Sequence, residues 1–236
     1  MKQEIIYGIR PVVETLGSGR RKVFEVLDAV GNEEVAKAAG TREIEVEQVS
    51  RQRVDELARG GLHQGVAARV EPYPYSGLEE ILASPEPLVL VLDGVTDPRN
   101  LGAVLRVADG AGASGIVVPR DRAAGVTAAA VKASAGASEH VRVARETNLR
   151  RAIEGMKDAG LWVYAAEAGG TPYTELDLAG PVGLVFGSEG RGVRRLVREA
   201  CDGTVSIPML GAVGSLNVSV ASAVLLYEVR RRRGWP

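Results

Sequence analysis

Residues 88–119, LVLVLDGVTDPRNLGAVLRVADGAGASGIVVP, decide the fold of this chain. The stretch begins and ends with continuous apolar runs, and the turn after the first run is rich in aspartate, proline and asparagine. One apolar stripe at helical spacing lies between the two runs, formed by Leu101, Val104, Leu105 and Ala108. A strand, a helix and a second strand in this order predict two parallel neighbours in one sheet.

The same alternation continues toward the C-terminus. Apolar runs predict strands at residues 88–93, 115–119, 140–144, 161–167, 182–187 and 204–209. Runs that are apolar throughout are typical of strands buried on both faces, with helices covering the sheet on each side. Residues 88–236 are therefore predicted to form an α/β domain with a parallel sheet.

The first part of the chain predicts a smaller α/β module, over residues 1–72. Its strands are expected at residues 23–29, 43–49 and 63–73, and its helices at residues 5–19, 32–40 and 51–59. Residues 73–87 fall in a stretch rich in proline, which predicts a linker between the module and the larger domain.

The composition bounds the class of protein. Of the 236 residues, 45% are hydrophobic and 25% are charged, and no apolar run approaches the roughly 18 residues that span a bilayer. The opening MKQEIIYGIR is not typical of a signal peptide, and the single cysteine, Cys201, excludes an internal disulfide framework. We therefore expect a globular protein of the cytoplasm, without a cysteine-rich metal site.

Charge gives no simple indication of the partner. The formal net charge is −1, although arginines gather in residues 191–198 and 230–236. Arginine clusters of this kind are most often solvated, but a local basic patch can bind phosphates on a protein of neutral total charge.

Ligands of parallel sheets bind beyond the carboxyl ends of the strands, and three loops there are unusual. The first, residues 92–112, carries Asn100 at a helix start and Arg106 away from the apolar stripe. Arg106 could instead form a surface ion pair with Asp109, three residues further on. The loop lacks the GxGxxG pattern of a dinucleotide site, which argues against a nicotinamide-dependent oxidoreductase.

The second loop, residues 185–193, reads VFGSEGRGV. Its three glycines let the backbone approach a ligand closely, and Glu189 places an acid among them.

The third loop, residues 207–221, reads IPMLGAVGSLNVSVA and leads into an apolar helix. Ser215, Asn217 and Ser219 crowd the start of that helix, whereas one cap needs only one side chain. Capping alone therefore does not account for all three side chains.

Together the three loops resemble the motifs of the SpoU, or TrmH-like, family of RNA 2′-O-ribose methyltransferases. The motifs are an Asn with an Arg six residues later, a GSEGxG loop and IP…GSLNVSVA, and the resemblance runs through residues 88–232. It implies a SPOUT-type domain with a C-terminal trefoil knot, S-adenosylmethionine as cofactor, S-adenosylhomocysteine as product and a homodimer. The stretches IIYGIRPVVETL and HQGVAARV resemble the L30e-like RNA-binding domain of the subgroup that methylates a guanosine of 23S ribosomal RNA.

The resemblance also assigns residues. It implies that the cofactor is bound by Gly187, Ile207 and Leu216. It implies that the catalytic residues are Asn100, Arg106, Glu189, Ser215 and Asn217, and that no metal is required. It thereby implies that the start of the last helix forms an active-site wall, with Ser219 as a cap or an inward-facing residue. Because arginine has a pKa above about 12, we favour a role for Arg106 in binding the target phosphate or orienting the hydroxyl, rather than as a literal base.

RNA is therefore the expected partner, and neither DNA nor a membrane is expected. In the small module, the candidates for RNA contact are Arg10, Arg20, Arg21 and Lys22, whereas His63 is expected to be structural. Three alternatives are a transfer-RNA substrate, an antibiotic-resistance site on ribosomal RNA, and a non-catalytic RNA-binding relative.

Overall fold

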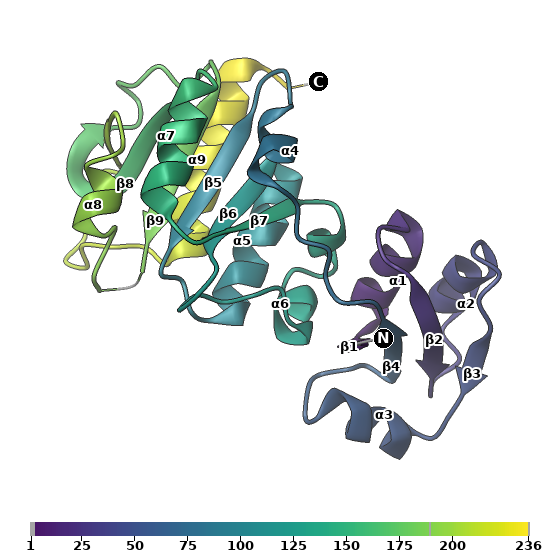
Figure 1. The fold of residues 1–236 in the computed structure, drawn as a ribbon. Helices are drawn as coiled ribbons and strands as arrows, with labels where there is room; N and C mark the ends of the chain where they lie inside the picture. The colour runs from purple at the N-terminus through teal and green to yellow at the C-terminus, as the bar shows by residue number, and fades with distance from the viewer. Residues whose placement is uncertain (1–2, 189, 236) are drawn as a thin grey trace.

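The computed structural model describes residues 3–188 and 190–235, which form two lobes, each built on its own sheet (Figure 1). The elements are β1 Glu4–Tyr7, α1 Ile9–Ser18, β2 Val23–Asp28, α2 Glu33–Gly40, β3 Val46–Gln48, α3 Arg51–Ala58, β4 Val66–Val70, α4 Leu78–Leu82, β5 Leu88–Asp93, α5 Pro98–Gly110, β6 Gly115–Pro119, α6 Ala128–Ala133, the 3₁₀ helix η1 Ala137–Glu139, β7 Arg142–Glu146, α7 Leu149–Asp158, β8 Trp162–Pro172, β9 Val182–Gly187, α8 Arg195–Arg198, β10 Gly203–Ser206 and α9 Val218–Arg233.

The larger sheet is parallel throughout, in the order β10-β8-β9-β5-β6-β7. Alternate residues of β5 are buried on opposite faces: Leu90 packs in a core with α5, α6 and α9, and Val91 packs in a core with α4, α7 and α8. Helices therefore cover both faces, which explains the continuous apolar runs and confirms the predicted α/β class.

Strand bounds follow the sequence closely in the middle of this sheet and less closely at its edge. The predicted strands at 88–93, 115–119 and 182–187 are β5, β6 and β9. Next to the edge strand β10, β8 is longer than predicted, because its pairing with β10 jumps from Ala165 to Thr171 and leaves the residues between them in a bulge.

The smaller sheet is mixed, in the order β1-β4-β2-β3, with only β2 and β3 parallel. The predicted helix over residues 5–19 is wrong at its start, because Ile5 and Ile6 lie in β1, paired with β4. Gly8, with φ of +103°, separates this strand from α1, a turn that other residues rarely adopt.

The predicted linker, residues 73–87, is mostly packed on the larger lobe. Tyr73 is buried, the amide of Ser76 donates to the carbonyl of Val143 at 2.9 Å, and Ile81 of α4 is fully buried against the sheet. The domain limits stay a prediction, but this connection is not a free tether.

The C-terminal arginines of α9 are bound to backbone carbonyls. Arg232 donates to Thr174 at 2.8 Å and Arg233 donates to Gly180 at 2.6 Å, and Arg230 donates to the carbonyl at the end of α5. These three arginines therefore fasten α9 to the end of α5 and to the segment between β8 and β9, rather than forming a solvated basic tail.

Two further expectations concern the trefoil knot and the membrane. The trefoil knot stays a prediction, since strand order does not define threading. Within residues 3–188 and 190–235, no helix is both long and apolar enough to cross a membrane.

Candidate active site

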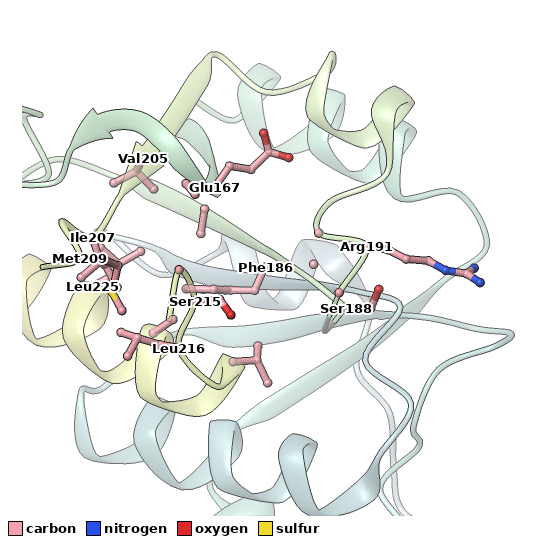
Figure 2. Close-up of a pocket in the computed structure, with 18 residues that line it drawn as sticks. Glu167, Phe186, Ser188, Arg191, Val205, Ile207, Met209, Ser215, Leu216 and Leu225 are labelled. Atoms are coloured by element: carbon pink, nitrogen blue, oxygen red, sulfur yellow. The ribbon is translucent and has the colours of Figure 1, made fainter. Parts of the chain in front are cut away.

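A cleft of about 590 Å³ lies at the carboxyl ends of β9 and β10 (Figure 2). The side chains of Phe186, Val205 and Leu225 give it an apolar lining, and the loops after β9 and β10 contribute exposed backbone. Figure 2 shows Leu225 at one end of the cleft and Ser188 and Arg191 at the other. The volume falls in the range of small-molecule sites, roughly 300–1,000 Å³.

The loop after β9 forms a wall made of backbone. The amide of Gly192 donates to the carbonyl of Ser188 at 3.0 Å, which closes the loop on itself. A Cβ at Gly187 would lie 1.9 Å from the carbonyl carbon of Gly192, so no larger residue fits there. Gly190 and Gly192 both have positive φ, at 82° and 65°. Only glycines allow this close approach of chain to chain and of chain to ligand.

Asp93, the last residue of β5, anchors this wall. Its carboxylate is fully buried and accepts two hydrogen bonds from Arg194, at 2.8 Å from the backbone amide and at 2.6 Å from Nε. Because β5 pairs with β9 in the register Asp93 to Gly187, the anchor fixes the loop at both of its ends. The aspartate that ends the run LVLVLD was a signal for this role, which our sequence analysis missed.

We predict that Asp93→Ala loosens the loop. The partly buried amide of Arg194 would lose its acceptor, which costs about 1 kcal/mol of folding free energy. Faster hydrogen exchange at residues 188–195, with a lower midpoint of denaturation in urea, is the expected result. Asp109→Ala, on the exposed face of α5, is the matched control. Unchanged exchange in Asp93→Ala would contradict the anchoring role.

The polar residues that precede α9 have separate tasks. Asn217 is the N-cap, and its Oδ1 accepts from the amide of Ser219 at 2.9 Å and from the hydroxyl of Ser219 at 2.7 Å. The Nδ2 of Asn217 donates to Oδ1 of Asn100 at 3.1 Å, which joins the start of α9 to the start of α5. Ser215 lines the cleft instead.

The predicted site residues fall into two groups, with Glu189 and Arg106 in neither. Those that line the cleft are Gly187, Ile207, Ser215 and Leu216. Asn100 and Asn217 lie next to each other at the starts of their helices. Glu189 lies outside the described residues.

Arg106 does not line the cleft. It is exposed on α5, about 9 Å further along the helix axis than Asn100. Across the described ranges, Arg106 forms no hydrogen bond or ion pair, so the alternative pairing with Asp109 is wrong.

The bulge of β8 adds cleft residues that the sequence analysis missed. Ala166, Glu167 and Ala168 all line the cleft, and Glu167 is held by Arg198 of α8 at 3.2 Å. The neighbouring pair Gly169 and Gly170 was the available signal, since glycine within a strand often marks a bulge.

Metal-binding side chains and the single thiol were two other possible features of a site within the part of the chain that is described. No group of three or more metal-binding side chains occurs there. Burial raises the pKa of the Cys201 thiol to about 12, so this cysteine stays protonated and is a poor nucleophile. The cleft is suited to a small molecule with an apolar part and a part that backbone groups and one hydroxyl can bind.

Comparison with known proteins gives matches over both lobes. Residues 87–227 match the SpoU rRNA methylase family, and residues 5–76 match the substrate-binding domain of RNA 2′-O-ribose methyltransferases. The chain is 45% identical to the 23S rRNA (guanosine-2′-O-)-methyltransferase RlmB of Yersinia pestis, over 98% of each protein. It is 43% identical to RlmB of Shewanella oneidensis, again over 98% of each.

Solved structures of related proteins share this fold. The SpoU methyltransferase AviRb of Streptomyces viridochromogenes, in complex with AdoMet, superimposes with a TM-score of 0.83 at 27% identity, covering 98% of this chain and 90% of the other. An AdoMet-bound rRNA methyltransferase of Sinorhizobium meliloti gives 0.82 at 29% identity, covering 97% and 87%. The family match and the structural superposition thus both cover nearly the whole length of this chain.

Proposed function

The chain belongs to the SpoU family of RNA 2′-O-ribose methyltransferases, and from this premise we propose that it methylates the ribose of a guanosine in 23S ribosomal RNA. The observation that carries the catalytic part is the glycine-walled cleft, because the residues expected to bind S-adenosylmethionine all line it. Support for the RNA target comes from the two RlmB relatives, which match this chain from end to end.

The cleft fits the cofactor. The absence of a side chain at Gly187 lets the backbone of Gly192 close over the end of β9, and Phe186 and Leu225 give an apolar surface for an adenine ring. When bound, S-adenosylmethionine supplies a methyl sulfonium, which is already a strong electrophile. Ile207 and Leu216 would hold it through the backbone, and Ser215 would offer a hydroxyl to its polar part.

The protein's remaining task is to align the ribose. The 2′-oxygen forms a bond to the methyl carbon while the bond from that carbon to sulfur breaks, and its electron pair stays on sulfur to give S-adenosylhomocysteine. Arg106 would bind the target phosphate and orient the hydroxyl, whose proton leaves through phosphate or water. Asn100 and Glu189 would position Arg106 and the nucleotide, next to Asn217.

Mapping of 2′-O-methyl groups tests this function. Ribosomal RNA from cells with and without the protein should differ by one methylated guanosine in 23S RNA, and purified protein with S-adenosylmethionine should restore it. A methyl group lost from transfer RNA alone would overturn the proposed target. Binding of RNA without any transfer would instead identify a non-catalytic relative. Work on ribosomal RNA is consistent with the cytoplasmic location that we expect.

We also propose that the protein acts as a homodimer through α9. Val220, Val224 and Tyr227 lie on one side of this helix, and Val220 and Tyr227 are 48% and 45% exposed. Trp235 extends the same apolar surface, with its ring 5.7 Å from that of Tyr227. A helix that is apolar on both faces is typical of a fully buried helix, and a second copy would cover the open face.

Val220→Asp should therefore dissociate the dimer. A charge placed in the centre of an apolar interface must be desolvated without a partner, which disfavours association. Sedimentation equilibrium should give twice the chain mass for the parent protein and the mass of one chain for the variant. Val30→Asp, at a valine that is 51% exposed in the small lobe, should stay dimeric. Equal masses for the parent and Val220→Asp would contradict this interface.

A further inference from the structure

A buried ion pair joins the two lobes. Arg21, just before β2, donates from Nε to Oε2 of Glu139 in η1 at 3.1 Å, and its terminal nitrogen donates to Oε1. The two side chains are 1% and 0% exposed. Arg21 also lies 3.7 Å from Glu4 and 3.4 Å from the carbonyl of Glu71. The contact is therefore bidentate, charged and sealed from water.

Arg20 and Tyr73 complete the contact. The guanidinium of Arg20 donates to the carbonyl of Val141 at 2.9 Å and to that of Pro74 at 3.2 Å, and it lies 5.2 Å above the ring of Tyr73. The hydroxyl of Tyr73 donates to the carbonyls of Ser138 and Val141, at 3.0 Å each. Burial raises the pKa of Tyr73 to about 12, so its hydroxyl stays a donor.

Arg21 is buried in this contact, so the prediction that it contacts RNA is wrong, whereas Arg20 is partly exposed and its contact with RNA stays a prediction, as do those of Arg10 and Lys22. The guanidinium groups of Arg20 and Arg21 are hydrogen-bonded within the protein, to main-chain carbonyls and to Glu139. A pattern of consecutive basic residues could not distinguish a surface patch from an internal contact.

Backbone of the two lobes approaches closely on both sides of this contact. A Cβ at Gly136 would lie 2.6 Å from Cβ of Glu14 in α1, and Gly136 has φ of +92°. Lys132 of α6 donates to Gln64 of the small lobe, and His140 lies 2.9 Å from Oε2 of Glu14. Interfaces between domains usually permit relative motion, whereas this one is interlocked.

The contact is well placed to orient a bound RNA. Helix α6 follows β6, so it begins at the same carboxyl edge of the sheet as the cleft, while η1 leads into the start of β7. Figure 1 shows the small lobe beside α6, with the end of β9 on the far side of the sheet. This contact would therefore set the distance between an RNA held by the small lobe and the cleft.

We propose that Arg20, Arg21 and Glu139 are positioning residues that hold the substrate-binding lobe in one orientation and so select the nucleotide that enters the cleft. This proposal rests on the proposed function. A buried ion pair adds little net stability compared with an apolar pair, because both charges lose their hydration. Its geometry, however, admits one arrangement only, and a fixed arrangement is what selection of one ribose requires.

The first test measures the distance between the lobes. One probe is placed at Val30→Cys in the small lobe and the other at Leu196→Cys on α8, both at exposed positions, in a Cys201→Ser background. One labelled protomer is mixed with excess unlabelled protein. The parent should give a single narrow distance distribution by electron spin resonance. Glu139→Gln, and Arg20→Met as a milder variant, should broaden it, whereas Arg53→Met, in an exposed pair within α3, should not.

The second test measures methyl transfer to unmodified 23S RNA transcribed in vitro. The contact formed by Arg20, Arg21 and Glu139 is called the lock, and its two variants are Glu139→Gln and Arg20→Met. Both lock variants should raise KM for the RNA by about tenfold or more and methylate additional riboses, because the lobe no longer holds the RNA at one distance from the cleft. Their Kd for S-adenosylmethionine should stay within about twofold of the parent, which separates a lost orientation from a damaged cleft.

The outcomes are distinct. Distance distributions as narrow as the parent's in both lock variants would overturn the proposal, and so would a parallel loss of cofactor affinity. Broadened distances with an unchanged KM and unchanged product sites would overturn the selective role. A parent protein that binds the cofactor but methylates no RNA would refute the proposed function, while the distance measurement still reports on the lock.

Discussion

Arg106→Lys is expected to lower kcat by about 100-fold or more while the Kd for S-adenosylmethionine stays unchanged. Lysine keeps the charge but not the planar fork that binds a phosphate at two points or aligns a hydroxyl. The side chain is exposed on α5 and lies outside the cofactor cleft, so its loss should leave cofactor binding intact. Single-turnover methylation of 23S RNA at neutral pH measures the effect.

Arg99→Lys is the matched control for this change. Arg99 lies in the first turn of the same helix, is exposed, and pairs with Asp97 at 3.0 Å, a pairing that lysine can reproduce. Near-normal turnover in Arg106→Lys would refute a bidentate or planar role.

Gly187→Ala is expected to raise the Kd for S-adenosylmethionine by about 100-fold or more, a loss of about 2.7 kcal/mol. The new methyl group would lie 1.9 Å from the carbonyl carbon of Gly192 and 2.2 Å from the amide of Val193. Both are backbone atoms, so the loop must move away from the end of β5 and the cleft must change shape. Titration calorimetry with the intact protein measures the affinity.

Gly214→Ala is the control within the same cleft. Gly214 also lines it, but a Cβ there meets nothing within 4 Å. Its Kd should therefore stay near that of the parent. Equal losses in both variants would show that the cleft tolerates no added methyl anywhere, and unchanged binding in Gly187→Ala would contradict the backbone wall.

The larger lobe could be predicted well because its strands are buried on both faces. A run such as residues 182–187 has no polar position to confuse the pattern, and its limits as β9 are the predicted ones. The small lobe was harder at its start, where Ile5 and Ile6 are compatible with a strand or a helix. Only pairing with β4, more than 60 residues further along the chain, decides between them.

The site could be predicted as a set of residues but not as an arrangement. Gly187 and Leu216, which the motifs assign to cofactor binding, line one cleft, because Gly187 ends β9 and Leu216 precedes α9. Asp93 is 101 positions from Arg194 in the sequence, and Glu139 is 118 positions from Arg21. Such contacts depend on tertiary packing, which no local pattern contains.

The assembly of the cleft has a consequence for how the protein is made. One wall comes from α9, which leaves a translating ribosome only after every strand of the larger sheet, while β5, β6 and β7 emerge much earlier. At about 5–20 residues per second, the roughly 70 residues between β7 and α9 take several seconds to synthesise. A nascent chain therefore carries an open, incomplete sheet during that interval, and truncation before Val218 should yield a product without donor-binding capacity, however well its first lobe has folded.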